Sequence, residues 1–344
     1  MNKKLLKKLY EIHALSGHEK KMRRFVMNYA RQCGKIAMTV DEFGNLFITK
    51  GISETYPCLA AHLDQVQHSH AKDFTAIECG EGIIFGYSPR QRTQQGLGAD
   101  DKNGIFICLE CLKKYDVLKL AFFVGEETGC VGSSQCDLEF FKDCRFIIEP
   151  DRRGAHDLIT SMFCGEVCSQ EFINAIAAER FGYREEQGSI TDVGELVERG
   201  VGISCLNLSC GYYEAHSDHE HTVLADLQNC LEFVQNIIET CTDVYPFVYE
   251  WRLSSYGKYD DRYGYGVYDL RDDDYEEWGY GEDFEEMYNL VRYNYISSFD
   301  EIEMLYKQNF VTSDISSLKN IYEDVVQYIS EEKRELAEKA ETYN

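Results

Sequence analysis

The stretch GLGADDKNGIF, residues 96–106, places two aspartates side by side in a glycine-flanked turn that opens an apolar segment. Such a pair usually caps a helix, because carboxylates accept the free N–H groups of the first turn and favour its positive end. Helix capping is therefore the first interpretation of Asp100 and Asp101. Whether the pair also takes part in chemistry depends on the segments around it.

Residues 1–241 alternate between helical and extended patterns around this turn. Apolar residues at helical spacing indicate helices, and short apolar runs bounded by turn residues indicate strands. Such alternation is typical of an α/β fold. The predicted helices cover residues 5–14, 20–32 and 103–115, and the predicted strands comprise a hairpin at 41–51 and runs at 57–61, 119–124 and 145–148.

Acidic residues and histidines follow the ends of the predicted strands. Because sites in open α/β sheets form at the edge where the strands end, we expect these side chains to meet there. Together they offer nitrogen and oxygen ligands that suit zinc or a similar divalent ion. In chain order they are His62, Asp100 in the turn, the pair Glu126 and Glu127, Asp151, and His219 within HSDHEH.

At two of these positions, the neighbouring residues give a further reason to expect a metal site. His62 and Asp64 lie two residues apart on an extended chain, so their side chains face the same way and the carboxylate can hydrogen-bond the second imidazole nitrogen. Glu126 and Glu127 follow an apolar strand, where two carboxylates repel each other unless a cation lies beside them. An ordinary surface location is the alternative for each pair.

Composition limits the classes of protein to which the chain can belong. Its 344 residues, 44% of them hydrophobic, can bury a full core and form one large domain with a smaller one. A net charge of −25 disfavours nucleic acid and anionic membranes as partners. No apolar run approaches the roughly 20 residues that cross a bilayer, and nothing indicates secretion. We expect a folded cytoplasmic protein whose fourteen cysteines are reduced.

The chain changes character near residue 241. All fourteen cysteines precede this point, whereas residues 242–344 contain 10 basic and 25 acidic residues. Nine carboxylates lie between Asp272 and Glu286, in a segment rich in tyrosine. Charge and periodicity predict a catalytic domain at 1–241, an acidic tyrosine-rich connector at 242–300 and a helical appendage at 301–344.

The motifs HLD, GADDKNG, GEETG, PD and HxxHE, in this order, resemble those of the co-catalytic dizinc exopeptidase superfamily, most closely its peptidase T and zinc aminopeptidase branches. SGHE followed by DEFGNL, and TDVGEL at residues 191–196, are also similar to segments of these enzymes. The resemblance covers about residues 1–240. It implies a mixed, mostly parallel sheet flanked by helices, and a cis peptide bond after the bridging aspartate.

The resemblance also implies a centre that holds two divalent metal ions, zinc or alternatively cobalt or manganese. Glu126 would be the general base, and Asp64 would be the partner of His62. Three carboxylates and two neutral imidazoles nearly balance two divalent cations, which agrees with such a centre. One ion would be held by His62, Asp100 and Asp151, and the other by Asp100, Glu127 and His219, with Asp100 as the bridge.

Two of these assignments have alternatives in the sequence. His216, His219 and His221 lie close together, and the spacing before HE favours His219. Glu149 competes with Asp151, because some relatives use a glutamate followed by proline. The one-carbon difference between these two side chains would change where the strand must end.

The chain departs from these relatives in its insertions. Peptidase T-like enzymes insert a lid domain before the last histidine, whereas only 68 residues separate Asp151 from His219. The tetrahedral aminopeptidases carry a large insertion where only 35 residues separate Asp64 from Ala99. Our hypothesis is that the acidic C-terminal region covers the cleft instead, by folding back or through contacts in an oligomer.

The sequence therefore favours a metal-dependent hydrolase of amide bonds, with aminopeptidase action on short peptides as the leading interpretation. An N-acyl amino acid amidohydrolase is the second interpretation, since the same centre attacks either amide. A third is a noncatalytic, metal-stabilised scaffold in which the acidic tail binds partners. The presence of Glu126 disfavours a scaffold, because a degenerate copy would lose that residue without structural penalty. A homo-oligomer is compatible with each interpretation.

Overall fold

The computed structural model describes residues 1–80, 82–162 and 165–250, together with Glu323 and Val326. Internal contacts divide the chain into two units, residues 1–254 and 255–344, and the first contains all the candidate site residues. Apart from those two residues, the predicted connector beyond residue 250 and the predicted helical appendage lie outside the described residues.

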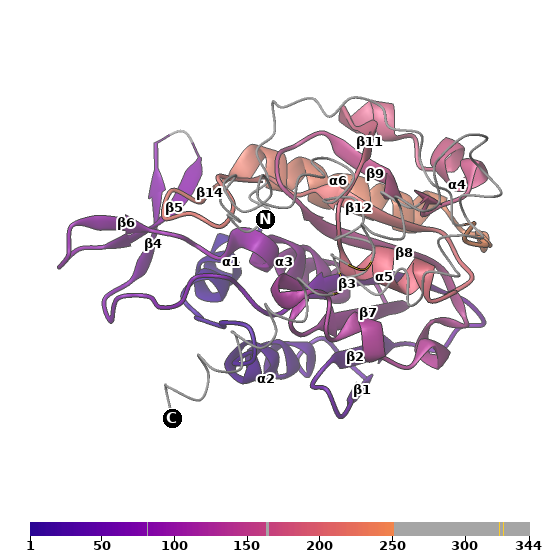
Figure 1. The fold of residues 1–344 in the computed structure, drawn as a ribbon, viewed down its shortest axis with the longest axis horizontal. Coiled ribbons are helices and arrows are strands. Elements are labelled where there is room, and N and C mark those ends of the chain that lie inside the picture. The colour runs from indigo at the N-terminus through magenta and orange to yellow at the C-terminus, as the bar shows by residue number, and fades with distance from the viewer. Residues whose placement is uncertain (81, 163–164, 251–322, 324–325, 327–344) are drawn as a thin grey trace. The chain divides into compact units, whose positions relative to one another are not determined.

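A nine-stranded mixed sheet forms the centre of the described residues (Figure 1). Its four middle strands run parallel, and antiparallel strands flank them, which confirms the predicted fold class. In order across the sheet, the strands are β1 (Ile36–Val40), β2 (Leu46–Lys50), β7 (Leu118–Phe123), β3 (Tyr56–His62), β8 (Cys144–Arg152), β12 (Cys205–Ser209), β9 (Asp157–Met162) and β10 (Gly165–Glu166), with β11 (Arg184–Gln187) paired to β9.

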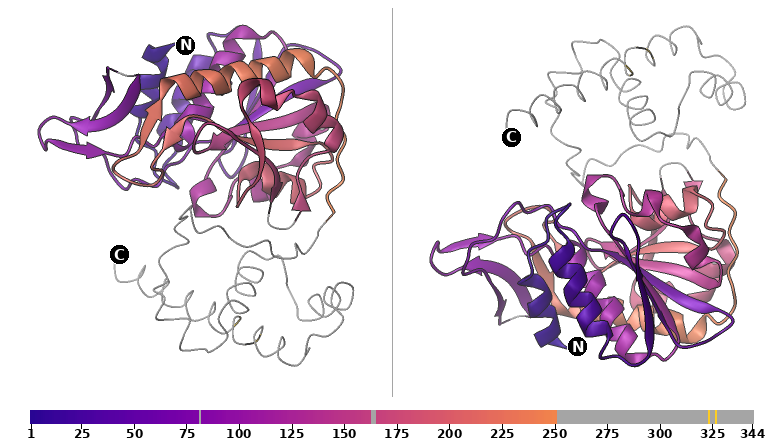
Figure 2. Two further views of the ribbon diagram at one scale, coloured as in Figure 1. Left: turned by 90° about the horizontal axis from the view of Figure 1, so that it is seen from above. Right: turned by 90° about the horizontal axis from the view of Figure 1, so that it is seen from below.

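Helices cover both faces of this sheet (Figures 1 and 2). Strand β3 illustrates this arrangement, because the side chains of a strand point alternately to the two faces of the sheet. Leu59 and Ala61 join one hydrophobic core, whereas Cys58 and Ala60 join the other. The first core is covered by α1 (Lys3–Tyr10), α2 (Lys20–Ala30), α3 (Ala99–Lys114), α4 (Gln170–Ala175) and α6 (Leu224–Thr240), and the second by α5 (Asp192–Glu198).

A smaller sheet lies beside the central one, at the left of Figure 1, and the sequence patterns did not predict it. The chain between Asp64 and Ala99 supplies three of its strands, and the other two flank the histidine-rich loop. The loop is therefore held by residues that are distant in sequence. Among the described residues this sheet comprises β13 (Tyr212–Tyr213), β14 (His221–Val223), β5 (Ile83–Ser88) and β4 (Thr75–Cys79), with β6 (Thr93–Gln95) paired to β5.

The predicted elements of the central layers differ from the structure mainly at their ends. The first helix begins at Lys3, where the Asn2 side chain accepts the N–H of Leu5, and it ends four residues earlier than predicted. The predicted hairpin at 41–51 is formed by β1 and β2, but its turn lies at 41–45. There the Asp41 carboxylate accepts three successive backbone N–H groups, which fixes the turn.

None of the helices in the described residues is both long enough and apolar enough to span a membrane. The described cysteines are free thiols, and most of them are buried in the two cores. Burial of a free cysteine is the behaviour of a small hydrophobic side chain.

Leu120 lies in β7 at the centre of the sheet and is fully buried. Leu120→Ala should lower the free energy of unfolding by about 2–5 kcal/mol, because it removes apolar contacts and leaves a cavity. Urea unfolding followed by circular dichroism measures this change. Ile52, whose exposed fraction is 98%, provides the control, and Ile52→Ala should change stability by less than about 0.5 kcal/mol. Equal losses for the two variants would contradict the central position of β7.

Candidate metal centre

Three neighbouring parallel strands deliver side chains to one edge of the central sheet. β3 ends at His62, which pairs in register with Phe123 at the end of β7. The short 3-10 helix η1 (Glu126–Thr128) follows β7, and Asp151 lies near the end of β8. The turn with Asp100 starts α3 at this same edge. Residues from four distant segments are thereby brought together.

The imidazole of His62 is fully buried, and its Nε2 atom faces three carboxylates. This nitrogen lies 2.9 Å from Asp100 Oδ1, 3.3 Å from Asp151 Oδ1 and 3.9 Å from Glu126 Oε2. A neutral imidazole has one ring nitrogen that can bind a metal ion. Nε2 of His62 therefore points at the place where the carboxylates converge.

Asp64 lies on the other side of the same ring. Its Oδ1 atom is 3.3 Å from His62 Nδ1, as expected for the carboxylate that fixes the tautomer of a ligand histidine. The Asp64 carboxylate also accepts the Ser16 hydroxyl and the backbone N–H groups of Glu126 and Glu127. One buried carboxylate thus positions the imidazole ring and the start of η1 together.

A second imidazole approaches the other oxygen of Asp100, and it belongs to His216. Its Nε2 lies 3.3 Å from Asp100 Oδ2 and 3.1 Å from Glu127 Oε2. His219, which the motif spacing favours, is exposed, and its backbone N–H donates to the Ser217 hydroxyl. The backbone of His216 is left-handed, with φ of 62°, so the chain changes direction at that residue. Spacing along the sequence does not reveal such a change.

Of the two competing acids on β8, Asp151 lies 3.3 Å from His62 Nε2, whereas one oxygen of Glu149 is bound at the start of α5. The fully buried Glu149 carboxylate accepts the Thr191 hydroxyl and the backbone N–H of Val193 at a distance of 3.1 Å. These groups lie at the N-terminal end of α5, where free N–H donors favour a carboxylate. Glu149 therefore holds α5 against the central sheet.

Asp101 holds the turn that presents Asp100. The peptide bond between these two residues is cis, as the resemblance implies. Asp101 Oδ1 accepts the Gly104 N–H at 2.8 Å, and its Oδ2 accepts the His62 N–H at 3.3 Å. A Cβ atom at Gly104 would collide with this carboxylate, so the close approach requires glycine.

Two sets of side chains place three candidate ligand atoms within 4.8 Å of one another: His62, Asp101 and Asp151, and His62, Asp100 and Glu127. Both oxygens of Asp101 already accept backbone N–H groups, which favours Asp100 as the ligand. Among the described residues, the buried atoms Glu127 Oε1 and Asp151 Oδ1 have no hydrogen-bond partner. Because a buried carboxylate oxygen is costly without a partner, this site fits divalent cations.

Without a metal ion, the two imidazoles bind protons strongly. Burial alone would lower the pKa of His62, but the neighbouring carboxylates, first Asp151, outweigh it and raise this pKa well above its usual value. Hydrogen bonds to Asp100 and Glu127 raise the pKa of His216 to about 11. Protonated imidazoles thereby balance part of the negative charge of the cluster.

Two buried residues that the sequence analysis did not single out support the turn before Asp100. Glu220 accepts the backbone N–H groups of Gly98 at 2.5 Å and of Asp100 at 3.2 Å. The Lys102 ammonium donates to Gln65 and to a backbone carbonyl. In the sequence, only their places in the motifs indicate a role for these two residues: Glu220 ends HxxHE, and Lys102 ends GADDK.

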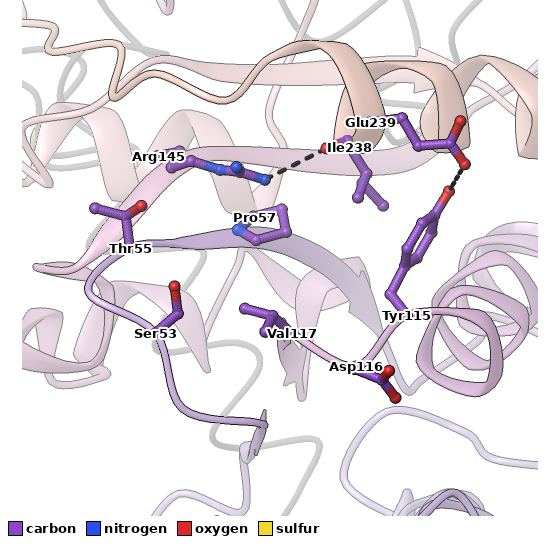
Figure 3. Close-up of a pocket in the computed structure, with 9 residues that line it drawn as sticks. All are labelled: Ser53, Thr55, Pro57, Tyr115, Asp116, Val117, Arg145, Ile238 and Glu239. Carbon is purple, nitrogen blue, oxygen red and sulfur yellow. Dashed lines mark hydrogen bonds between the residues drawn. The ribbon is translucent and has the colours of Figure 1, made fainter.

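A groove of about 410 Å³ lies at the opposite ends of the same strands (Figure 3). It is lined in part by Pro57 near the start of β3, Val117 just before β7 and Arg145 near the start of β8. The Arg145 guanidinium donates to the Ile238 carbonyl in the last turn of α6. Since His62 ends β3 at the other edge, the groove is separate from the acidic cluster.

The chain is similar to solved peptidase structures, although no family model and no curated protein matches its sequence. Aminopeptidase PepT from Bacillus cereus has a TM-score of 0.57 and 15% identity, over 69% of this chain and 97% of its own. A tripeptidase from Staphylococcus aureus has a TM-score of 0.56 and 16% identity, over 69% and 97%. TET1 peptidase from Pyrococcus horikoshii, which can assemble into a tetrahedron or an octahedral shell, has a TM-score of 0.51 and 15% identity, over 68% and 98%.

These identities are low, so the likeness concerns the fold. It shows that the described residues share the arrangement of helices and strands found in these peptidase structures.

His216 and His219 can be distinguished by metal content. His216→Ala should bind less metal than the unaltered chain, because Asp100 and Glu127 then lack their nitrogen partner. His219→Ala, a matched control three residues away, should keep the metal content of the unaltered chain. Elemental analysis after gel filtration measures both. Loss of metal in His219→Ala with retention in His216→Ala would refute this assignment.

Metal affinity should increase as the pH rises through the neutral range. The raised pKa values mean that both imidazoles are protonated in the metal-free chain, and for His216 this holds up to about pH 11. Incoming metal ions must displace these protons, so binding should release protons and tighten at higher pH. Calorimetry in buffers of different ionisation enthalpy measures the release. An affinity that stays constant between about pH 6 and pH 9 would contradict the charge state described for these imidazoles.

Proposed function

We propose that this chain is a metal-dependent peptidase that removes residues from the N-terminal end of short peptides. The observation that carries the proposal is the position of Asp100, whose Oδ1 faces His62 and whose Oδ2 faces His216. A carboxylate with an imidazole at each oxygen is suited to bridge two cations, each with its own ligand set. The fold likeness to aminopeptidases and a tripeptidase supports the same activity.

The proposed centre would hold two divalent ions, with Asp100 as a ligand shared by both. His216 takes the place that the motif spacing gave to His219. Mixed nitrogen and oxygen ligands favour zinc, with cobalt or manganese as alternatives. Three carboxylates and two neutral imidazoles leave about one positive charge, which suits the binding of an anionic nucleophile. The two ligand sets are His62, Asp100 and Asp151 for one ion, and Asp100, Glu127 and His216 for the other.

Glu126 is the proposed general base. Its carboxylate reaches to within 3.9 Å of His62 Nε2, so it lies beside the centre, and it is outside both ligand sets. Burial raises its pKa well above the usual value, which suits a group that both accepts and returns a proton. When bound, two divalent ions lower the pKa of a water molecule and polarise the scissile carbonyl. Glu126 would accept a proton from the attacking water and return it to the leaving amine.

Asp64 is a positioning residue in this proposal. It orients the ring of His62 through Nδ1, and it binds the backbone N–H groups of Glu126 and Glu127. Asp64 therefore contacts the proposed base Glu126, the proposed ligand Glu127 on η1 and the proposed ligand His62 on β3. Such an anchor keeps the base at a fixed distance from the ligands, as proton transfer requires.

The proposal extends to the substrate and to the assembly of the chain. An N-acyl amino acid would meet the same chemistry, and the peptidases among the similar structures favour peptides over it. Assembly into a homo-oligomer is supported by the TET1 peptidase, which shares the fold and forms closed shells.

The proposal is tested by metal removal, metal return and one substitution. After chelation, zinc, cobalt or manganese should restore release of N-terminal residues from short peptides. Glu126→Gln should lower kcat by about 10²- to 10⁴-fold with metal content unchanged, because it removes the base and spares the ligands. Glu139→Gln, on the exposed 3-10 turn η3 (Leu138–Phe141), is the control and should keep full activity.

Three outcomes would change the conclusion. Full activity in Glu126→Gln would exclude that residue as the base. Turnover of N-acyl amino acids without turnover of peptides would favour the amidohydrolase. A metal-loaded chain that hydrolyses neither class would favour the noncatalytic scaffold.

A further inference from the structure

The buried hydroxyl of Tyr212 lies against the candidate centre. Tyr212 begins β13, is 2% exposed and belongs to the hydrophobic core. Its hydroxyl lies 3.0 Å from Asp100 Oδ2 and 3.1 Å from the backbone carbonyl of Asp151. The single O–H of the phenol can donate to Asp100 Oδ2 or to that carbonyl, so the hydroxyl lies between the Asp100 carboxylate and the end of β8.

Asp100 Oδ2 is the oxygen that needs such a contact. The Oδ1 atom faces the fully buried ring of His62, whose position is fixed by its surroundings. The Oδ2 atom faces His216, whose side chain is 44% exposed on the loop between β13 and β14. A half-exposed loop residue is a weak restraint on the rotation of a carboxylate. Tyr212 approaches the same oxygen from a buried position in β13.

The contact is compatible with a metal ion on the same oxygen. A carboxylate oxygen offers two lone-pair directions, so one can accept the phenol O–H while the other faces a cation. Hydrogen bonds to ligating carboxylates orient them, and their loss typically weakens metal binding by about 10- to 100-fold. The effect should fall on the ion that Oδ2 serves.

We propose that Tyr212 is a positioning residue that sets the plane of the Asp100 carboxylate and thereby builds the half of the centre formed with Glu127 and His216. This inference rests on the proposed two-ion site. Tyr212 acts through Asp100 and does not itself hold a metal ion.

The neighbouring tyrosine provides a matched control. Tyr213 points to the other face of the same strand, where its hydroxyl donates to Asp226 and its ring stacks on His221. Tyr212→Phe and Tyr213→Phe each remove one hydroxyl and keep the ring. Stepwise zinc dissociation constants of the full-length chain can be measured by competition with a chromogenic chelator.

Tyr212→Phe should weaken one of the two zinc-binding steps by about 10- to 100-fold and change the other by less than about threefold. Tyr213→Phe should change neither step. In a His216→Ala background, where the affected half is already lost, Tyr212→Phe should leave the remaining step unchanged. Thermal unfolding of the metal-free proteins checks that both phenylalanine variants keep the fold.

Several results would overturn the inference. Unchanged zinc binding in Tyr212→Phe, equal weakening of both steps, or the same loss in Tyr213→Phe would each exclude the positioning role. A wild-type chain that binds no zinc would refute the proposed function as well. Two zinc-binding steps that are both insensitive to Tyr212→Phe would refute the inference alone.

Discussion

The arrangement of the site depends on one carboxylate that lies between two imidazoles. Asp100 meets His62 with one oxygen and His216 with the other, and the remaining acids are distributed between those two sides. Buried like charges repel one another strongly, so this cluster requires positive charge inside it or protonation of some of its carboxylates, and the pKa values of Glu126 and Asp151 are raised. Protonated imidazoles supply part of that charge in the metal-free chain, and divalent ions would supply more. The same acidity that makes the cluster costly makes it selective for cations.

The protein holds this cluster mainly with backbone contacts. Asp101, Glu220 and Asp64 are buried carboxylates, and each accepts backbone N–H groups of the segments that carry candidate ligands. These three carboxylates thus hold the candidate ligand side chains in position. Glycine at residue 104 lets α3 approach close enough for this bonding. The network explains why short motifs, and not single residues, carry the resemblance to known enzymes.

Strands β3, β7 and β8 of the central sheet could be predicted from sequence because each is an apolar run that leads to an acidic or histidine residue. The turn of residues 96–106, the helix after it and the strands that end near His62 and Asp151 follow from such local patterns. The small sheet was not predicted, because its strands are short and its pairing joins β5 to β14, more than a hundred residues apart.

The sequence alone also could not show whether His216 or His219 lies beside Asp100. Both lie in one loop, and the imidazole that reaches Asp100 is that of His216, whose backbone is left-handed. Tyr212 had no signal of its own, since an aromatic residue in an apolar strand is ordinarily part of a core. Patterns along the chain therefore specified which segments meet, whereas long-range pairing and loop geometry specified which atoms meet.

The small sheet links two parts of the chain that motif comparison treats as separate. The segment between Asp64 and Ala99 packs its strand β5 against β14, directly after the loop that carries His216. A change in the length or twist of that segment would move one imidazole of the centre while the central sheet stays in place. The length of a peripheral segment therefore bears on how His216 approaches Asp100, with both side chains unaltered.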